Sequence, residues 1–168
     1  HLRAHGAPLC DSVDSEAYLT RALAAISASG VQPDALIFTG DLADHGEDDA
    51  YDRIAALVEP LAASLDARVI WVMGNHDARG AFRAELWDES PDDLRPVDRV
   101  QEFDGLRIVT LDTSVPGHHH GELSDDQLAW LRDELATPAR HGSILAMHHP
   151  PLPSHVPMFD ILELQNQP

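Results

Sequence analysis

The sequence has 168 residues, of which 43% are hydrophobic, enough for one sizeable core but too few for two ordinary domains. We therefore expect a single domain over residues 1–168. The formal charge of -18 argues against a general nucleic-acid-binding surface, because an acidic surface repels polyanions. No apolar run is long enough to span a bilayer. The single cysteine, Cys10, cannot form an internal disulfide, which is compatible with the cytoplasmic location that we expect.

The first predicted elements are a helix and a strand. Apolar residues at helical spacing predict a helix from Asp14 to Ser29, with Asp14 as its N-cap and Gly30 as its end. The apolar run from Ala35 to Thr39 has the length of a buried strand, and it leads directly into Gly40-Asp41.

A second helix and strand follow. An apolar stripe from Tyr51 to Leu65 predicts a helix, and Pro60 within it should kink the helix or begin another one. The apolar, β-rich run from Arg68 to Met73 predicts a strand that ends at Gly74-Asn75-His76-Asp77. A short helix is expected around residues 81–86.

The middle of the chain contains a hairpin signal. The acidic, proline-containing stretch from Asp88 to Pro96 predicts a surface loop. Two apolar runs, 100–103 and 106–112, then flank Asp104-Gly105, a dipeptide that favours a tight hairpin turn. Helices on an aliphatic sheet predict an α/β fold, and this hairpin makes the sheet mixed.

The last predicted elements are a capped helix and a strand. Ser124 and Gln127 have the spacing of a capping box before an apolar stripe. The run from Ser143 to Met147 predicts a strand, and His148-His149-Pro150-Pro151 follows it.

Three predicted strands that look buried therefore end in residues of metal-ligand type: Asp41, Asn75 and His148. Ligands gather beyond the carboxyl ends of strands in open α/β sheets, so these residues can converge on one site. Imidazole, carboxylate and amide donors together suit Mn, Fe or Zn. Each piece alone has a plainer interpretation, since Gly40-Asp41 can be only a turn and the histidines can be satisfied core residues.

The motifs GDLAD at 40–44, GNHD at 74–77 and HHPP at 148–151 resemble those of the calcineurin-like metallophosphoesterase superfamily. The segments LVEPLAA, VIWVMGNHD, LDTSVPGHHHGEL and WLRDELATPA are similar to class III cyclic-nucleotide phosphodiesterases, the mycobacterial type most of all. This resemblance covers nearly the whole chain and implies a metallophosphoesterase-type αββα sandwich with mixed sheets.

The resemblance also implies two divalent or trivalent metal ions, Fe/Mn or Mn/Mn, with Zn as a further candidate. His1 stands where the His of the family's DxH motif belongs, and would bind the first metal. Asp41 would be shared by both metals. Asn75 and His148 would bind the second.

Other residues receive supporting roles. The family places His76 beside the leaving-group oxygen, which this side chain can stabilise or protonate. Asp77 would orient His76 or a neighbouring ligand. Asp44 would act likewise near Asp41, or be an ordinary loop carboxylate. Gly117-His118-His119-His120 has the letters of the family's closing GHxH motif but precedes His148, so we expect a loop whose His119 touches substrate, or a surface histidine cluster.

The ends of the chain depart from the family pattern. The Asp of DxH would precede His1, and the closing GHxH motif would follow Pro168. We therefore expect a domain truncated at both ends, which alone would bind metal poorly and turn over slowly or not at all.

The function implied by the resemblance is hydrolysis of cyclic AMP to the nucleoside monophosphate. The expected partner is a small cyclic nucleotide, and a homodimer is possible, although no residue pattern identifies an interface. One alternative is another hydrolase on this scaffold, acting on 2′,3′-cyclic nucleotides, nucleotides, phosphoproteins or lipid headgroups. Another is a non-catalytic module whose incomplete metal site serves binding or regulation.

Overall fold

The computed structural model describes residues 1–153 and 155–166 and divides into two compact units. The first unit contains His1–Trp71 and His76–Arg95, and the second contains Val72–Asn75 and Pro96–Pro168. The GNHD motif is thus divided, because Asn75 belongs to the second unit and His76 to the first.

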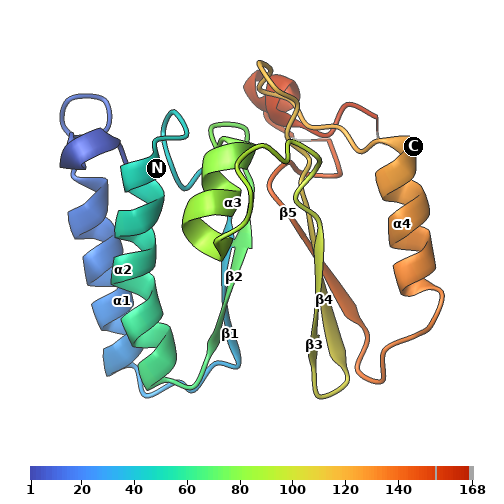
Figure 1. The fold of residues 1–168 in the computed structure, drawn as a ribbon, viewed down its shortest axis with the longest axis horizontal. Helices are drawn as coiled ribbons and strands as arrows, with labels where there is room; N and C mark the ends of the chain where they lie inside the picture. Colours follow the sequence, from blue (N-terminus) through green and yellow to red (C-terminus); the bar gives the residue numbers. More distant parts are fainter. Residues whose placement is uncertain (154, 167–168) are drawn as a thin grey trace. The chain divides into compact units, whose positions relative to one another are not determined.

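The first unit is built around a two-stranded sheet (Figure 1). Its elements are η1 (Ala4–Gly6), α1 (Ser15–Ala28), β1 (Ala35–Thr39), α2 (Asp48–Ser64), β2 (Arg68–Val72) and α3 (Arg79–Trp87). The N–H of Arg68 donates to the carbonyl of Asp34 over 3.0 Å, so the two strands begin side by side. Since a helix joins them, they run in parallel and bring GDLAD and GNHD to the same end of the sheet.

The helices of this unit follow from local signals. The Asp14 side chain accepts a hydrogen bond from the N–H of Ala17 over 2.9 Å, which confirms the predicted N-cap of α1. α2 begins earlier than its apolar stripe indicated and continues through Pro60, which is exposed. The second helix that we allowed for at Pro60 therefore does not form. The buried face of α2 carries Ala50, Tyr51, Ile54, Val58 and Ala62.

The second unit contains a three-stranded sheet with one helix beside it (Figure 1). Its elements are β3 (Arg99–Phe103), β4 (Leu106–Leu111), α4 (Asp125–Leu135), β5 (Ser143–Met147) and η2 (Pro157–Leu162). β3 pairs with β4 antiparallel and β4 pairs with β5 parallel, so the predicted mixed sheet is confirmed. Asp104 and Gly105 turn the hairpin with φ values of 38° and 96°, a left-handed conformation that glycine adopts without strain.

The core of this unit forms between the sheet and α4. Val109 and Leu111 of β4 pack with Leu123 and Leu164, and Trp130 lies against this cluster from α4. The predicted capping box is confirmed, since the side chains of Ser124 and Gln127 each accept a hydrogen bond from the other residue's N–H.

One expectation about the strands is wrong. β5 was expected to be buried, but Ile144 is 43% exposed and Leu145 is 41% exposed. Within the described residues β5 pairs only with β4, so it is an edge strand whose apolar side chains remain accessible. In β1, Ile37 is likewise 37% exposed.

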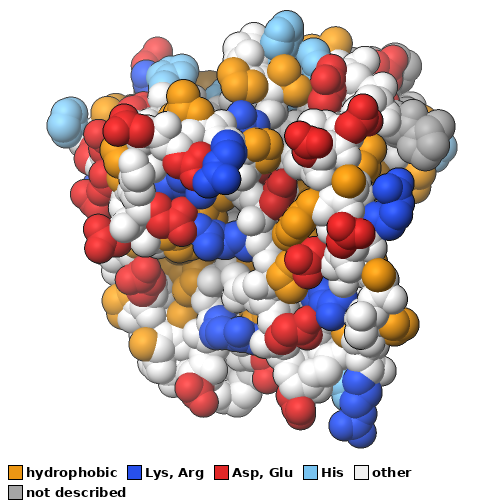
Figure 2. Space-filling view, turned by 45° about the vertical axis from the view of Figure 1, so that its right-hand side comes forward, with side chains coloured by type: hydrophobic (Ala, Val, Ile, Leu, Met, Phe, Trp, Pro, Cys, Tyr) orange, Lys and Arg blue, Asp and Glu red, His pale blue; other side chains and the backbone are white. Residues whose placement is uncertain are grey.

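Charged side chains are dispersed over the face of the molecule that Figure 2 shows. On the face shown in Figure 2, acidic side chains are scattered, and basic side chains lie between them. This distribution is typical of a solvated acidic surface.

The cap of α4 allows a test of the fold. Replacing Ser124 by Ala leaves the N–H of Gln127 without its acceptor and should lower the free energy of unfolding by about 1 kcal/mol. Ser27→Ala is the matched control, because Ser27 is exposed within α1 and alanine favours helix. Urea denaturation measures both. Equal stability of the two variants would contradict the capping role.

Candidate metal site

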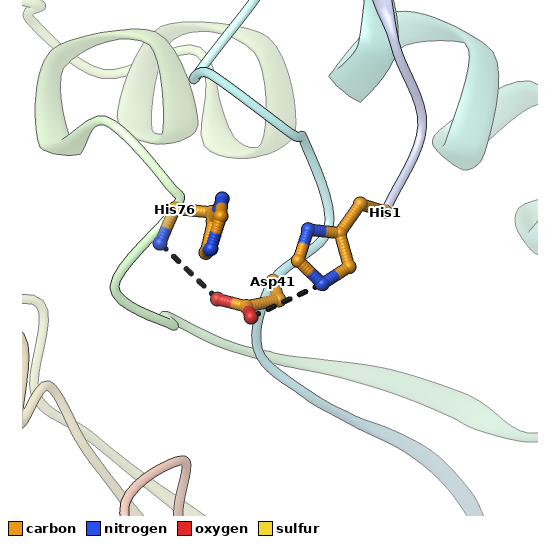
Figure 3. A group of neighbouring side chains, drawn as sticks. All are labelled: His1, Asp41 and His76. Atoms are coloured by element: carbon orange, nitrogen blue, oxygen red, sulfur yellow. Dashed lines mark hydrogen bonds and ion pairs between the residues drawn. The ribbon is translucent and has the colours of Figure 1, made fainter. Parts of the chain in front are cut away.

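Three side chains of the first unit form a group with the donors of a metal site. Nε2 of His1 lies 3.2 Å from Oδ2 of Asp41, and the N–H of His76 donates to Oδ1 of Asp41 over 3.1 Å (Figure 3). The His1 and His76 rings meet edge to face, with centroids 4.5 Å apart. One ligand atom from each residue lies within 4.8 Å of the others. The His1 imidazole and the Asp41 carboxylate form a mixed nitrogen and oxygen set that fits a borderline divalent metal, and the His76 ring lies beside them.

The backbone explains how these residues meet. Asp41 follows β1 in a left-handed conformation, with a φ of 54°, so the chain turns sharply as it leaves the strand. His1 is held beside it because the N–H of Leu2 donates to the carbonyl of Leu42 and the N–H of Asp44 donates to the carbonyl of Leu2, both over 2.8 Å. His76 lies in the loop that follows β2.

Asp44 supports both histidines. Its carboxylate lies 3.4 Å from Nδ1 of His1 and 3.2 Å from Nε of Arg3. Its carbonyl lies 2.8 Å from Nδ1 of His76. A carbonyl only accepts, so Nδ1 of His76 carries the proton, and the neutral ring has its lone pair on Nε2. Asp44 therefore contacts both histidines, and its orienting role stays a prediction.

Asp77 ties the two motifs of this unit together. Its carboxylate accepts hydrogen bonds from the N–H groups of Leu42 and Ala43, each over 3.0 Å. It also accepts one from the hydroxyl of Tyr51 over 3.1 Å. Asp77 thus contacts the backbone of GDLAD, and its role in orienting His76 or a neighbouring ligand stays a prediction.

Tyr51 was missed by the sequence reasoning as a residue of the site. It is completely buried on α2, and its hydroxyl accepts a hydrogen bond from the N–H of Ala78 over 3.0 Å. Burial, followed by the charge of Asp77, raises the pKa of Tyr51 well above its usual value. The only sequence signal was a hydroxyl-bearing side chain within an otherwise apolar stripe.

The second unit holds the other predicted ligands. Nδ2 of Asn75 lies 3.4 Å from Nδ1 of His119, so the loop with three histidines reaches a predicted ligand. His148 follows β5 directly, and its ring meets that of His149 with centroids 4.9 Å apart. His149 is 1% exposed and both of its ring nitrogens have partners, as in the alternative of a satisfied core histidine that the sequence left open for this pair. That Asp41, Asn75 and His148 share metals stays a prediction.

A cavity of about 190 Å³ opens beside His1 and Asp41 in the first unit. Most of its remaining wall is apolar, with Leu19, Phe38 and Ile54 among the lining residues. Because pockets for small organic ligands usually measure roughly 300–1,000 Å³, this cavity alone is too small to be assigned a substrate.

Comparisons with known proteins identify the family of the chain. Residues 5–166 match the family model described as calcineurin-like phosphoesterase. A probable cyclic nucleotide phosphodiesterase of Rhodococcus erythropolis is 56% identical over 99% of the chain and 55% of its own length. A cAMP/cGMP dual specificity phosphodiesterase of Mycobacterium tuberculosis is 53% identical over 99% of the chain and 52% of its own length. The chain therefore spans about half the length of these curated relatives.

A solved structure shows the same fold at lower sequence similarity. A dimetal phosphatase from Danio rerio superposes with a TM-score of 0.57 and 18% identity, over 89% of the chain and 64% of the phosphatase. This similarity confirms the predicted α/β metallophosphoesterase fold. None of the helices in the described part of the chain has the length and apolar character needed to cross a membrane.

The buried Tyr51 hydroxyl provides a stability test. Tyr51→Phe removes a donor to Asp77 and the acceptor of the Ala78 N–H, and should lower the free energy of unfolding by about 1–3 kcal/mol at neutral pH. Tyr18→Phe is the control, because Tyr18 is 60% exposed. Urea denaturation of the three proteins measures the effect, and a variant as stable as the wild type would contradict it.

The contribution of the Tyr51–Asp77 pair to the free energy of unfolding depends on pH. The folded-state pKa of Tyr51 is raised, so its stabilising effect is fully present below the unfolded-state pKa of 10.0 and is lost as pH rises beyond it. The difference in stability between wild type and Tyr51→Phe should therefore shrink above about pH 10. A difference that stays constant with pH would contradict the raised pKa.

Proposed function

Because the chain belongs to the calcineurin-like phosphoesterase family, we propose that the full-length protein hydrolyses a cyclic nucleotide with the help of two metal ions. The observation that carries the proposal is the grouping of His1, Asp41 and His76 at the end of a parallel strand pair. The first candidate substrate is 3′,5′-cyclic AMP, with 5′-AMP as product. The names of the Rhodococcus and Mycobacterium relatives support this choice.

We propose four metal ligands: His1, Asp41, Asn75 and His148. His1 and Asp41 would hold one cation, and Asp41 together with Asn75 and His148 would hold the other. When bound, the two cations lower the pKa of a water molecule and neutralise charge on the phosphoryl oxygens. Mixed imidazole, carboxylate and amide donors suit Mn, Fe or Zn. The family resemblance favours Mn/Mn or Fe/Mn among these, with Zn as a further candidate.

His76 would donate a proton to the leaving group. Water attacks phosphorus and loses a proton, the bond from phosphorus to the 3′ oxygen breaks, and the departing oxygen needs a proton. Because Nδ1 of His76 is committed to the carbonyl of Asp44, the protonated ring would deliver this proton from Nε2. The edge-to-face contact with the His1 ring and the bond from the His76 N–H to Asp41 hold His76 beside these two residues.

Two variants of the full-length protein separate these roles. His76→Ala should lower kcat by about 10²–10⁴-fold, since general acid catalysis contributes on that order, while the metal content stays at the wild-type level. Asp41→Asn should lose both activity and metal, because it removes the charge that the two cations share. Steady-state kinetics with Mn²⁺ and elemental analysis of the purified proteins measure both effects.

His5→Ala is the matched control for removing a histidine, since the His5 side chain is 93% exposed. Its kcat and metal content should equal those of the wild type. Wild-type metal content in Asp41→Asn would contradict the assigned metal site, and wild-type kcat in His76→Ala would contradict the proton transfer.

The substrate is tested by a comparison of three compounds. With the full-length protein and Mn²⁺, kcat/KM should be highest for 3′,5′-cyclic AMP, lower for 2′,3′-cyclic AMP and lowest for a phosphomonoester. A reversed order would favour another hydrolase on the same scaffold. Absence of metal-dependent hydrolysis with all three would favour a non-catalytic module. The homodimer and the cytoplasmic location stay predictions.

A further inference from the structure

His149 is a buried polar residue of the second unit whose two ring nitrogens both have partners. Nδ1 lies 2.7 Å from the hydroxyl oxygen of Thr113, and Nε2 lies 3.1 Å from the carbonyl oxygen of His119. A carbonyl accepts only, so Nε2 carries the proton and Nδ1 of the neutral ring accepts from the Thr113 hydroxyl. Thr113 is completely buried, so the tautomer and the orientation of the ring are both fixed.

The loop Gly117–Gly121 is built around this ring. A Cβ atom at Gly121 would lie only 2.4 Å from Cγ of His149, so the backbone of Gly121 passes directly against the imidazole. Gly121 also donates to the carbonyl of Glu163 over 3.0 Å and accepts from the N–H of Gln165 over 2.8 Å. The main chain is therefore held at His119 by His149 and at Gly121 by two backbone bonds.

The side chain of His119 extends this arrangement to Asn75. The amide nitrogen of Asn75 can only donate, so Nδ1 of His119 accepts its hydrogen over the distance of 3.4 Å. Holding the nitrogen on one side of an amide leaves the oxygen on the other side. An amide binds a cation through that oxygen, so the orientation of this group decides whether Asn75 can act as a ligand.

We propose that His149 is a positioning residue, which fixes the main chain at His119 so that the His119 ring turns the Asn75 amide oxygen toward a cation. The inference rests on the proposed function, because it needs Asn75 to be a metal ligand. It gives Thr113, His149 and the loop Gly117–Gly121 a role in orienting Asn75. Neither the family motifs nor the strand ends require that role.

The experiment measures metal affinity rather than activity. The full-length protein is titrated with Mn²⁺, and the signal of the free ion is followed by electron paramagnetic resonance. The wild type should bind two ions. His119→Ala and Thr113→Val should each weaken one of the two sites by about 10–100-fold, the usual effect of losing a partner that orients a ligand, and leave the other site unchanged. Thr113→Ser keeps the hydroxyl and should behave as the wild type.

The double variant separates positioning from a merely structural role. If His149 acts through His119, then Thr113→Val combined with His119→Ala should bind Mn²⁺ no more weakly than His119→Ala alone. The inference is overturned if the double variant binds Mn²⁺ more weakly by the product of the two separate effects. It is also overturned if both Mn²⁺ sites are weakened equally. Should Thr113→Val fail to fold, His119→Ala decides alone, because the His119 side chain is exposed and wild-type affinity in that variant overturns the inference.

A separate measurement distinguishes this failure from that of the proposed function. In metal-free protein, the side-chain amide resonances of Asn75 should shift in His119→Ala and Thr113→Val but not in Thr113→Ser. A wild type that binds no Mn²⁺ contradicts the proposed function and the inference with it. A wild type that binds two ions, with unaffected variants, overturns the inference alone.

Discussion

The carboxylate of Asp77 binds the backbone of a loop that lies 34 and 35 residues earlier in the chain. These bonds to Leu42 and Ala43 hold the GDLAD and GNHD loops in one register, and the grouping of His1, Asp41 and His76 depends on that register. Two parallel strands bring the loops to the same end of a sheet, but strand pairing alone does not fix the positions of loop side chains. The buried Tyr51 hydroxyl in turn fixes the carboxylate.

Both units use the same physical arrangement. In each, a buried hydroxyl group is hydrogen-bonded to a polar side chain that in turn binds the backbone of a loop. The pair is Tyr51 and Asp77 in the first unit, and Thr113 and His149 in the second. A buried polar group without a partner is costly, so such pairs have few alternative geometries and hold the loops above them rigidly. Loops held in this way are already ordered before a cation binds, so binding does not have to offset the entropy lost in ordering them.

Part of this could be predicted from residues alone. Asp41 and Asn75 stand at strand ends, where an apolar run stops at a glycine, and the cap at Ser124 is purely local. Tyr51 could not be singled out, because a helical stripe does not show which member's polar atom meets a partner from another loop. Choosing between His148 and His149 as the buried one requires the register of β5. The exposed face of β5 could not be predicted either, because the exposure of its side chains depends on what packs against the strand.

The central claim is that Asp41 lies where the two loops of the first unit bring metal donors together. Its most direct test is the anomalous difference map of full-length crystals loaded with Mn²⁺, recorded at the manganese absorption edge. We expect a peak within coordination distance of both the Asp41 carboxylate and the His1 imidazole. Manganese bound elsewhere in a fully loaded crystal, with none at the Asp41 carboxylate, would contradict the account.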